Sequence, residues 1–360
     1  MQLLTTALSI LLVCSADASA QVKQQPTPVK PGAAMYADVK AKSPNAADIY
    51  LLAIEELRKA LHDPTKALSD PAGDFLGLPV EAAAQIEDPS NQLWCDAVTK
   101  SAVAITLFAQ ASQISRCEFD RYPKELATGL TRQLNDFGIM LKVMTAHGWQ
   151  QSKRAPTSAV MTGLKMLRYA DHCVQDRSLL GVALGLHAEE RAASLLEAAV
   201  SELATQEQAE VNADRLLKQL EACLNRRLSN AVIADVAEHD FAFHLENGLG
   251  EEAHKNPDLS WAVKRAKVIM RELFEPLRQK PAMPIELFRV RWSRRIDSLK
   301  EIRKGENMDD FLATGSGEPL AAVLVLLACV PPSQLLEMCH ANAAVLQSCA
   351  GDLRKIARGN

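Results

Sequence analysis

The hydrophobic positions of this chain recur with the period of an α-helix, most clearly between Leu130 and Leu203. Three stripes of apolar residues follow one another there, and each would lie along one side of a helix. The stripes comprise Leu130, Leu134, Phe137, Leu141 and Met144, then Val160, Leu164, Leu167 and Val174, then Leu179, Val182, Leu186, Ala193, Leu196, Val200 and Leu203. Because no single helix can hide its stripe from water, the pattern predicts antiparallel helical hairpins.

Glycine and proline mark the expected ends of these helices. We expect Gly148 to close the first helix in the left-handed conformation, which glycine adopts without a steric cost. Pro156 is expected in the first turn of the second helix. Arg177 and Ser178 mark a short break before the third. Further on, the segment 247–250 (Asn-Gly-Leu-Gly) is expected to break another helix. It is the best candidate boundary between two subdomains, and a compact hinge is the alternative.

A resemblance to a known group of proteins covers roughly residues 90–204. The residues that carry it are Cys117-Glu118-Phe119-Asp120 and Ala146-His147-Gly148, together with the helices around them. These features resemble a broad group of exported, functionally uncharacterised, all-helical bacterial proteins, in which a Cys-acid-aromatic element precedes a tetratricopeptide-like (TPR-like) hairpin. Members often carry Trp where this chain has Phe119. The resemblance implies helical hairpins and export, and it implies no activity.

The composition agrees with a helical fold. The chain has 360 residues, of which 48% are hydrophobic and only 5% aromatic, and this balance favours helix over sheet. We predict an all-α protein of antiparallel helical hairpins, stacked as a TPR-like array or an irregular bundle. The N-terminal helical region would span residues 45–248 and the C-terminal region residues 251–360, packed as one continuous domain.

The N-terminus has the pattern of an export signal. Leu3 to Val13 is a short apolar run, and Ala18-Ser19-Ala20 is a small-residue cleavage site, although no Lys or Arg precedes the run. We expect a signal peptide at residues 1–20, a flexible leader at 21–44 and a location in the periplasm or cell envelope of a bacterium. Lipidation at Cys14 and an uncleaved or cytoplasmic chain are the alternatives. The mature chain is expected to have no transmembrane helix, since the apolar run Leu320–Val330 is too short to span a bilayer.

Seven cysteines remain if Cys14 leaves with the signal, so at least one would be unpaired within the monomer. Cys339 and Cys349 are expected on one helix, about 15 Å apart and beyond disulfide reach. Most of the cysteines are expected to be small core residues. A disulfide framework is the alternative.

Two Glu-x-x-His pairs suggest metal chemistry. Glu251 with His254 and Glu337 with His340 would each place a carboxylate and an imidazole on one helical face, as in carboxylate-bridged di-iron bundles. Such a site needs further glutamates, and Glu189 could supply one. However, Glu251 is expected in the glycine-broken loop, and short spacings of this kind arise by chance.

Glu189 is the sharpest single candidate, because it lies within the apolar stripe of the third helix. Such a carboxylate either pairs with a buried cation or has a raised pKa that would suit a general acid. The alternative is a groove-edge glutamate paired with an arginine. Asp240 and His244, four residues apart, are expected to form a surface pair.

A basic segment, residues 264–304, is the main indication of a partner. It holds thirteen basic residues against five acidic ones. Five arginines lie mostly away from the local apolar stripe and could bind an anionic polymer or lipid surface: Arg289, Arg291, Arg294, Arg295 and Arg303. The alternative is a solvated face balanced by acidic neighbours. The net charge of −4 provides no global basic field, so we expect no specific nucleic-acid partner.

These patterns favour an exported, non-enzymatic scaffold or binding module whose partner is a protein or an envelope component. We expect no cofactor. Two alternatives remain: a metal-binding bundle or enzyme that uses Glu189 or the Glu-x-x-His pairs, and attachment to an anionic envelope surface through the basic segment.

Overall fold

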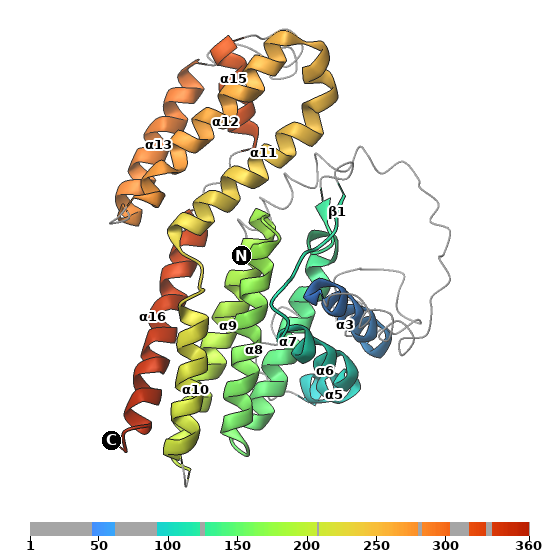
Figure 1. The fold of residues 1–360 in the computed structure, drawn as a ribbon, viewed down its shortest axis with the longest axis vertical. Coiled ribbons are helices and arrows are strands. Elements are labelled where there is room, and N and C mark those ends of the chain that lie inside the picture. The colour runs from blue at the N-terminus through green and yellow to red at the C-terminus, as the bar shows by residue number, and fades with distance from the viewer. Residues whose placement is uncertain are drawn as a thin grey trace.

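The computed structural model describes residues 45–61, 92–122, 127–206, 209–279, 283–302, 317–328 and 333–359. The all-α class is confirmed, since helices form nearly all of the described chain (Figure 1). The first elements are α3 (Ala46–Leu61), α5 (Gln92–Lys100), α6 (Ala102–Ala111), β1 (Arg121–Tyr122), β2 (Ala127–Thr128) and the 3-10 helix η2 (Thr131–Gln133). They are followed by α7 (Leu134–Ser152), α8 (Pro156–Gln175), α9 (Leu179–Leu203), α10 (Ala209–Leu224) and α11 (Asn230–Lys255). The last are α12 (Pro257–Arg278), α13 (Ile285–Ile302), α15 (Gly317–Ala328) and α16 (Ser333–Ile356).

Helices α7, α8 and α9 form the expected antiparallel hairpins, and α8 packs along both neighbours (Figure 1). The prediction that Gly148 ends the first helix is wrong, because α7 continues through it to Ser152. A Cβ atom at this position would lie 2.2 Å from Cδ2 of Leu195, a fully buried residue of α9. Gly148 therefore allows α7 and α9 to approach closely, and it does not serve as a turn.

The other predicted helix boundaries in this region agree with the structure. Pro156 is the first residue of α8. Ser178 caps α9, since its hydroxyl accepts a hydrogen bond of 2.9 Å from the N–H of Gly181. Arg177, in the connection between the two helices, has a φ of 53°, a left-handed conformation that non-glycine residues seldom adopt.

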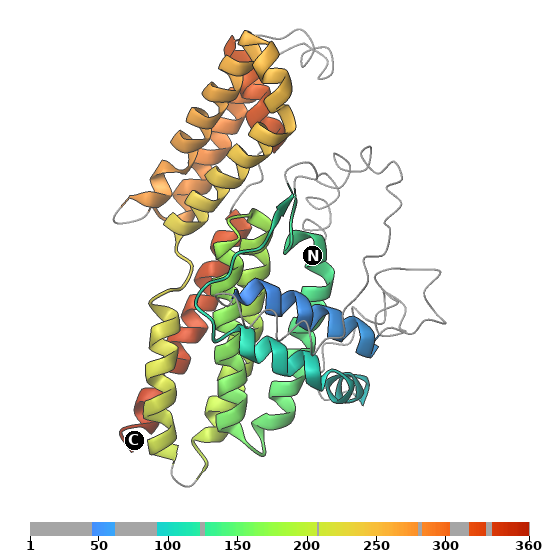
Figure 2. The same cartoon turned by 45° about the vertical axis from the view of Figure 1, so that its right-hand side comes forward.

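The apolar residues Val98, Val103 and Phe108 predict one helix over residues 91–115, but the structure has two helices, which meet at Ser101. Ser101 has φ −92° and ψ 16°, outside the helical range, so the chain changes direction there. The change allows α5 to pack against α7 while α6 packs against α3 (Figure 2).

The described residues bury two hydrophobic cores. The first joins α3 and α5–α10 to the C-terminal half of α16. The second joins α11, α12, α13 and α15 to the N-terminal half of α16. Two residues near the start of α9, Val182 and Leu186, also belong to the second core, so α9 and α16 connect the two (Figure 1).

The predicted helix break at residues 247–250 is wrong, because α11 continues through the glycines to Lys255. Glu251 therefore lies on a helix and not in a loop. The residues of the second core begin before this position, at Leu228 and Ile233, near the connection between α10 and α11.

Among the described residues, no helix is both long enough and apolar enough to cross a membrane. Cys339 and Cys349 share α16 as expected, and both are buried, as are Cys117 and Cys173. The six cysteines of the described chain are free thiols. The expected signal peptide and leader, Cys14 and Cys329 lie outside the described residues, and the TPR-like arrangement stays a prediction.

Candidate functional site

Glu189 lies where the two hydrophobic cores meet. Along α9, Leu186 belongs to the second core, and Ala188 and Ala192 belong to the first. The carboxylate is therefore enclosed by apolar side chains on both sides, and its side chain is only 5% exposed. A buried carboxylate of this kind is costly unless a cation or hydrogen-bond donors face it.

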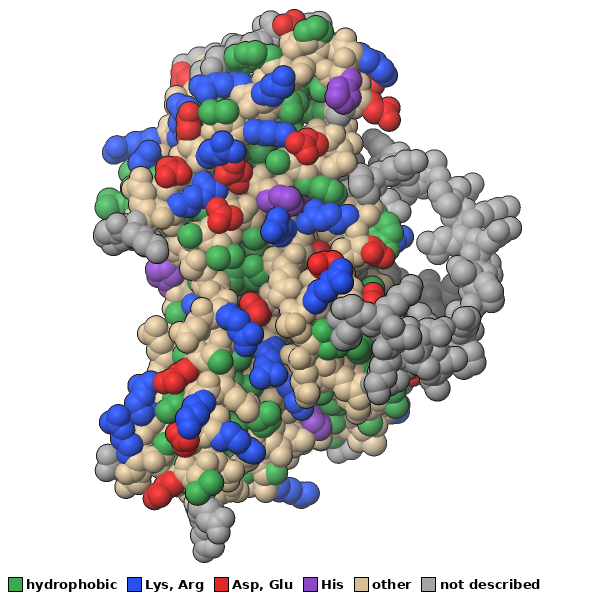
Figure 3. Space-filling view, in the orientation of Figure 1, with side chains coloured by type: hydrophobic (Ala, Val, Ile, Leu, Met, Phe, Trp, Pro, Cys, Tyr) green, Lys and Arg blue, Asp and Glu red, His purple; other side chains and the backbone are tan. Residues whose placement is uncertain are grey.

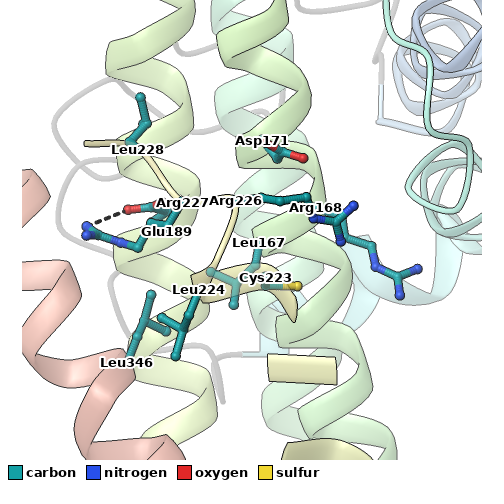
Figure 4. A pocket seen from close by; sticks show the side chains of 10 residues that line it. All are labelled: Leu167, Arg168, Asp171, Glu189, Cys223, Leu224, Arg226, Arg227, Leu228 and Leu346. Atoms are coloured by element: carbon teal, nitrogen blue, oxygen red, sulfur yellow. Dashed lines mark hydrogen bonds and ion pairs between the residues drawn. The ribbon is translucent and has the colours of Figure 1, made fainter. Parts of the chain in front are cut away.

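The cation is Arg227, in the connection between α10 and α11. Its Nη2 lies 2.9 Å from Oε2 of Glu189, and its side chain is only 11% exposed (Figure 4). The same Nη2 donates to the backbone carbonyl of Cys339 on α16. One guanidinium therefore holds together α9, α16 and the segment that leads into the second core.

Asn342 of α16 completes this group, which we call the Glu189 junction. Its side-chain amide donates a hydrogen bond of 2.9 Å to the backbone carbonyl of Leu186 and also bonds to Glu189. Burial raises the pKa of Glu189, and Arg227 and Asn342 lower it in part. The sequence predicted that Glu189 either pairs with a buried cation or has a raised pKa. Both features occur together, since Glu189 is paired with the buried Arg227 and its pKa is raised.

A small pocket opens beside the Glu189 junction (Figure 4). Its lining residues come from α8, α9, α10, α16 and the α10–α11 connection: Leu167, Arg168, Asp171, Glu189, Cys223, Leu224, Arg226, Arg227, Leu228 and Leu346. The cavity holds about 20 Å³, room for about one water molecule. In Figure 4, Arg168 points away from the Glu189–Arg227 pair.

The chemistry of the pocket favours a structural role. Burial raises the pKa of the Cys223 thiol, so the thiolate that a nucleophile requires is disfavoured. Burial also raises the pKa of Asp171, while Arg226 opposes this shift. Glu189 has its cation in place, and the cavity is too small for an organic substrate next to it.

Comparison with known proteins gives no family. No protein-family model, no curated protein and no solved structure matches this chain.

A second buried polar cluster was missed by the sequence reading. Asp176, at the end of α8, is 3% exposed and accepts hydrogen bonds from the hydroxyls of Thr128, at 3.1 Å, and Ser178. Arg121 of β1 donates to the backbone carbonyl of Asp176 at 2.5 Å. The β-hairpin is thereby attached to the turn between α8 and α9. The one local sequence feature that could have indicated this cluster is the spacing of Asp176 and Ser178 directly before the apolar helix α9.

Asp240 of α11 extends this cluster. Its Oδ2 accepts a hydrogen bond of 3.1 Å from the N–H of Leu179, the first residue of α9, and its Oδ1 lies 3.5 Å from Nε2 of His244. The expected pair of Asp240 and His244 exists, but it is not a surface pair, because Asp240 is only 9% exposed. Burial raises the pKa of both Asp176 and Asp240.

The Glu-x-x-His pairs do not converge with Glu189. Glu251 and His254 are exposed on α11. Glu337 forms an ion pair with Arg289, and His340 lies 3.2 Å from the side-chain oxygen of Asn230. Within the described ranges, no three His, Cys, Asp or Glu side chains are placed to hold a metal ion.

The predicted basic residues divide into two groups. Arg289 pairs with Glu286 and Glu337, and Arg295 lies 3.5 Å from Glu272 of α12. Arg291 and Arg294 are exposed and form no ion pair with an acidic group of the described chain. Arg303 lies outside the described residues.

Proposed function

We propose that this protein is an exported, non-enzymatic binding module that uses α12 and α13 as its contact surface. The observation that carries the proposal is the position of the exposed large hydrophobic residues. Of the six in the described chain, four lie on these two helices: Trp261, Val268, Leu287 and Val290. Two of them lie on each helix, and exposed apolar side chains of this size are candidates for contact with a partner where they form a patch.

The sequence of α13 explains why its surface differs from that of an ordinary solvated helix. Phe288, Trp292 and Leu299 turn one side of the helix into the second core. Leu287 and Val290 lie on the other side, 59% and 47% exposed. They contribute little to the core in these positions, and they are the apolar side chains of α13 that a partner would contact.

The competing proposal, an enzyme or a metal-binding bundle, has weaker support. Its central residue, Glu189, is bonded to Arg227 and Asn342, and its proposed partner Glu337 is bonded to Arg289. Metal analysis of the purified mature protein tests this alternative, because stoichiometric iron, manganese or zinc would favour it over a binding module.

Export belongs to the same proposal and rests on the N-terminal sequence. Mass spectrometry of the protein recovered from its native cells is expected to give a chain that begins at Gln21, after cleavage behind Ala20. Export would be contradicted if the chain in the native cells kept Met1 to Ala20 and remained in the cytoplasm. The contact surface is tested by a separate experiment.

Site-specific photo-crosslinking in the producing cells tests the contact surface. A photoreactive residue replaces Leu287, which is 59% exposed, or Val103 of α6, which is 57% exposed and serves as the matched control. We expect a discrete crosslinked product at 287 and none at 103. Equal crosslinking at both positions, or crosslinking at 103 alone, would contradict the proposal.

A further inference from the structure

The outward sides of α12 and α13 share one chemistry. On α12, Trp261, Lys264 and Val268 are spaced by three and four residues, so they lie on one side of the helix. The same spacing recurs on α13, where Val290 and Arg291 follow Leu287 by three and four residues and Arg294 follows them by four and three. We call these seven residues the α12–α13 face: Trp261, Lys264, Val268, Leu287, Val290, Arg291 and Arg294.

Ion pairs neutralise the basic residues around this face. Lys267 pairs with Glu246 of α11, Arg271 with Glu238 at 2.8 Å, and Arg278 with Asp235 at 2.7 Å and with Glu238. On the other side, Arg289 pairs with Glu337 of α16. These arginines and lysines attach α12 and α13 to neighbouring helices.

Three cations of the face are not neutralised in this way. Lys264, Arg291 and Arg294 are exposed, and none of them lies within ion-pair distance of an acidic side chain in the described ranges. The nearby acids have other partners: Glu272 pairs with Arg265 and Arg295, Glu275 with Arg278, and Asp297 with Lys300. These three cations give the seven-residue face a positive charge, although Asp297 and Glu301 follow Arg294 on α13 at the same spacing and the chain as a whole has a net charge of −4.

We propose that the α12–α13 face docks on the surface of a bilayer that contains anionic phospholipid. This inference rests on the proposed binding function. Trp261, Val268, Leu287 and Val290 enter the interface between headgroups and acyl chains, and Lys264, Arg291 and Arg294 bind lipid phosphates. Apolar side chains and unpaired cations alternate on these helical surfaces. They fit the boundary of a bilayer, where acyl chains and charged headgroups lie within a few ångströms of each other.

The shape of the face favours a bilayer over a single bound helix or peptide. A helix binds in a groove that encloses its apolar side. Over α12 and α13, Figure 3 shows basic, acidic and hydrophobic side chains intermingled, with no deep groove. The pocket described above lies elsewhere, between α8 and α10. A surface without a deep groove suits an extended bilayer better than a single helix.

Vesicle flotation tests the proposal with the full mature chain. We expect binding to phosphatidylcholine vesicles that contain phosphatidylglycerol, little binding to phosphatidylcholine alone, and loss of binding as salt is raised. Each neutralised cation is expected to weaken binding roughly fivefold. The variant R291Q/R294Q should therefore lose more than tenfold, and the control K218Q/K355Q, which removes two exposed lysines on α10 and α16, should bind as the parent does.

Two further variants test insertion of the apolar residues. L287S should weaken binding, and V211S, at a position of α10 that is 77% exposed, should not. Trp261 is 44% exposed, whereas Trp94 and Trp292 are buried and Trp149 is partly buried against the first core. Vesicle binding should therefore shift the tryptophan emission to shorter wavelength, and W261F should remove most of the shift. Circular dichroism confirms that each variant is folded.

The outcomes separate this proposal from the binding function on which it rests. Absence of binding to the anionic vesicles, or equal loss in R291Q/R294Q and in K218Q/K355Q, overturns the lipid proposal. If position 287 then still crosslinks to a protein in cells, the face binds an acidic protein and the binding function stands. If vesicles and crosslinking both fail, the binding function falls as well.

Discussion

At the scale of single residues, the Glu189 junction shows how a charged group is accommodated between two apolar cores. Glu189 and Arg227 are 38 positions apart in the sequence, and the structure places their charged atoms 2.9 Å apart. A buried pair of this kind adds little net stability compared with apolar residues of the same size, but losing one partner is costly. The pair therefore fixes which segments meet at the boundary between the cores.

The variant R227M tests this account. It leaves the Glu189 carboxylate buried without its cation, and we expect a loss of about 3–5 kcal/mol in the free energy of unfolding at neutral pH. Since the pKa of Glu189 is already raised by burial, lowering the pH should protonate the carboxyl in the folded state and recover part of this loss. Urea denaturation at several pH values measures both effects.

The double variant E189L/R227M is the control for that experiment. It removes the carboxylate together with its cation, so it should be much more stable than R227M and should not show the recovery at low pH. A double variant as unstable as R227M would mean that Arg227 acts through its bond to the Cys339 carbonyl and not through the ion pair.

His172 provides a second prediction at this scale. Its Nδ1 lies 3.0 Å from the Tyr50 hydroxyl in the first core, and burial lowers its pKa from 6.5 to about 4. Between these two pH values the unfolded chain binds more protons at this position than the folded chain does. Stability should therefore fall as the pH falls from about 6.5 to about 4, by an amount of order 3 kcal/mol for this residue.

The measurement compares the pH dependence of the unfolding free energy in the wild type and in H172Q. The variant lacks the titrating imidazole, so its stability should decline less steeply over the same interval. Burial raises the pKa of Asp171, Asp176, Asp240 and Glu189, which acts in the opposite direction but equally in both proteins. Parallel curves for the two proteins would show that His172 is protonated in the folded state.

At the scale of elements, glycine positions show the difference between local and tertiary requirements. Gly148 and Gly185 both lie inside helices, where glycine is intrinsically unfavourable. A Cβ at Gly185 would lie 3.0 Å from the backbone carbonyl of Ala170 on α8. Both residues are therefore accounted for by close helix packing, which overrides helix propensity.

Two substitutions within α7 test this interpretation. Gly138 has nothing within 4 Å of the position that a Cβ would occupy, so G138A should raise the free energy of unfolding by about 0.5–1 kcal/mol. G148A should lower it by about 1–3 kcal/mol, because the buried side chain of Leu195 must move. Thermal or urea unfolding distinguishes the two, and equal effects would contradict the packing role of Gly148.

The sequence predicted the elements better than it predicted their partners. Apolar periodicity was sufficient for α8 and α9, whose first residues are set by the local signals Pro156 and Ser178. It failed at 247–250, where α11 stays helical through two glycines although most of this part of the helix is exposed. It also failed at Ser101, where α5 and α6 turn to reach different helices.

The candidate site was predictable only in part, for the same reason. The position of Glu189 within an apolar stripe indicated a paired or protonated carboxyl. Nothing local indicated Arg227, Asn342 or the Cys339 carbonyl, because these groups come from distant segments that only the folded chain brings together. The sequence also could not predict which arginines of α13 form ion pairs with other helices. Arg289 and Arg295 do so, and Arg291 and Arg294 do not.

At the scale of the whole molecule, two cores share α9 and α16, and the second core presents the α12–α13 face (Figure 2). The internal charges near the boundary bind the cores to each other. The unpaired cations and exposed apolar residues of α12 and α13 lie on the outside. The interior thus accounts for the stability of the molecule, and the proposed binding function belongs to the outer face.

Hydrogen–deuterium exchange of the mature protein, alone and with envelope membranes from its native cells, tests this account most directly. Peptides that cover residues 261–268 and 287–294 should exchange more slowly in the presence of the membranes. Those that line the pocket, at 167–171 and 223–228, should not change. Protection of the pocket, with α12 and α13 unaffected, would contradict the account and would place the function at the Glu189 junction.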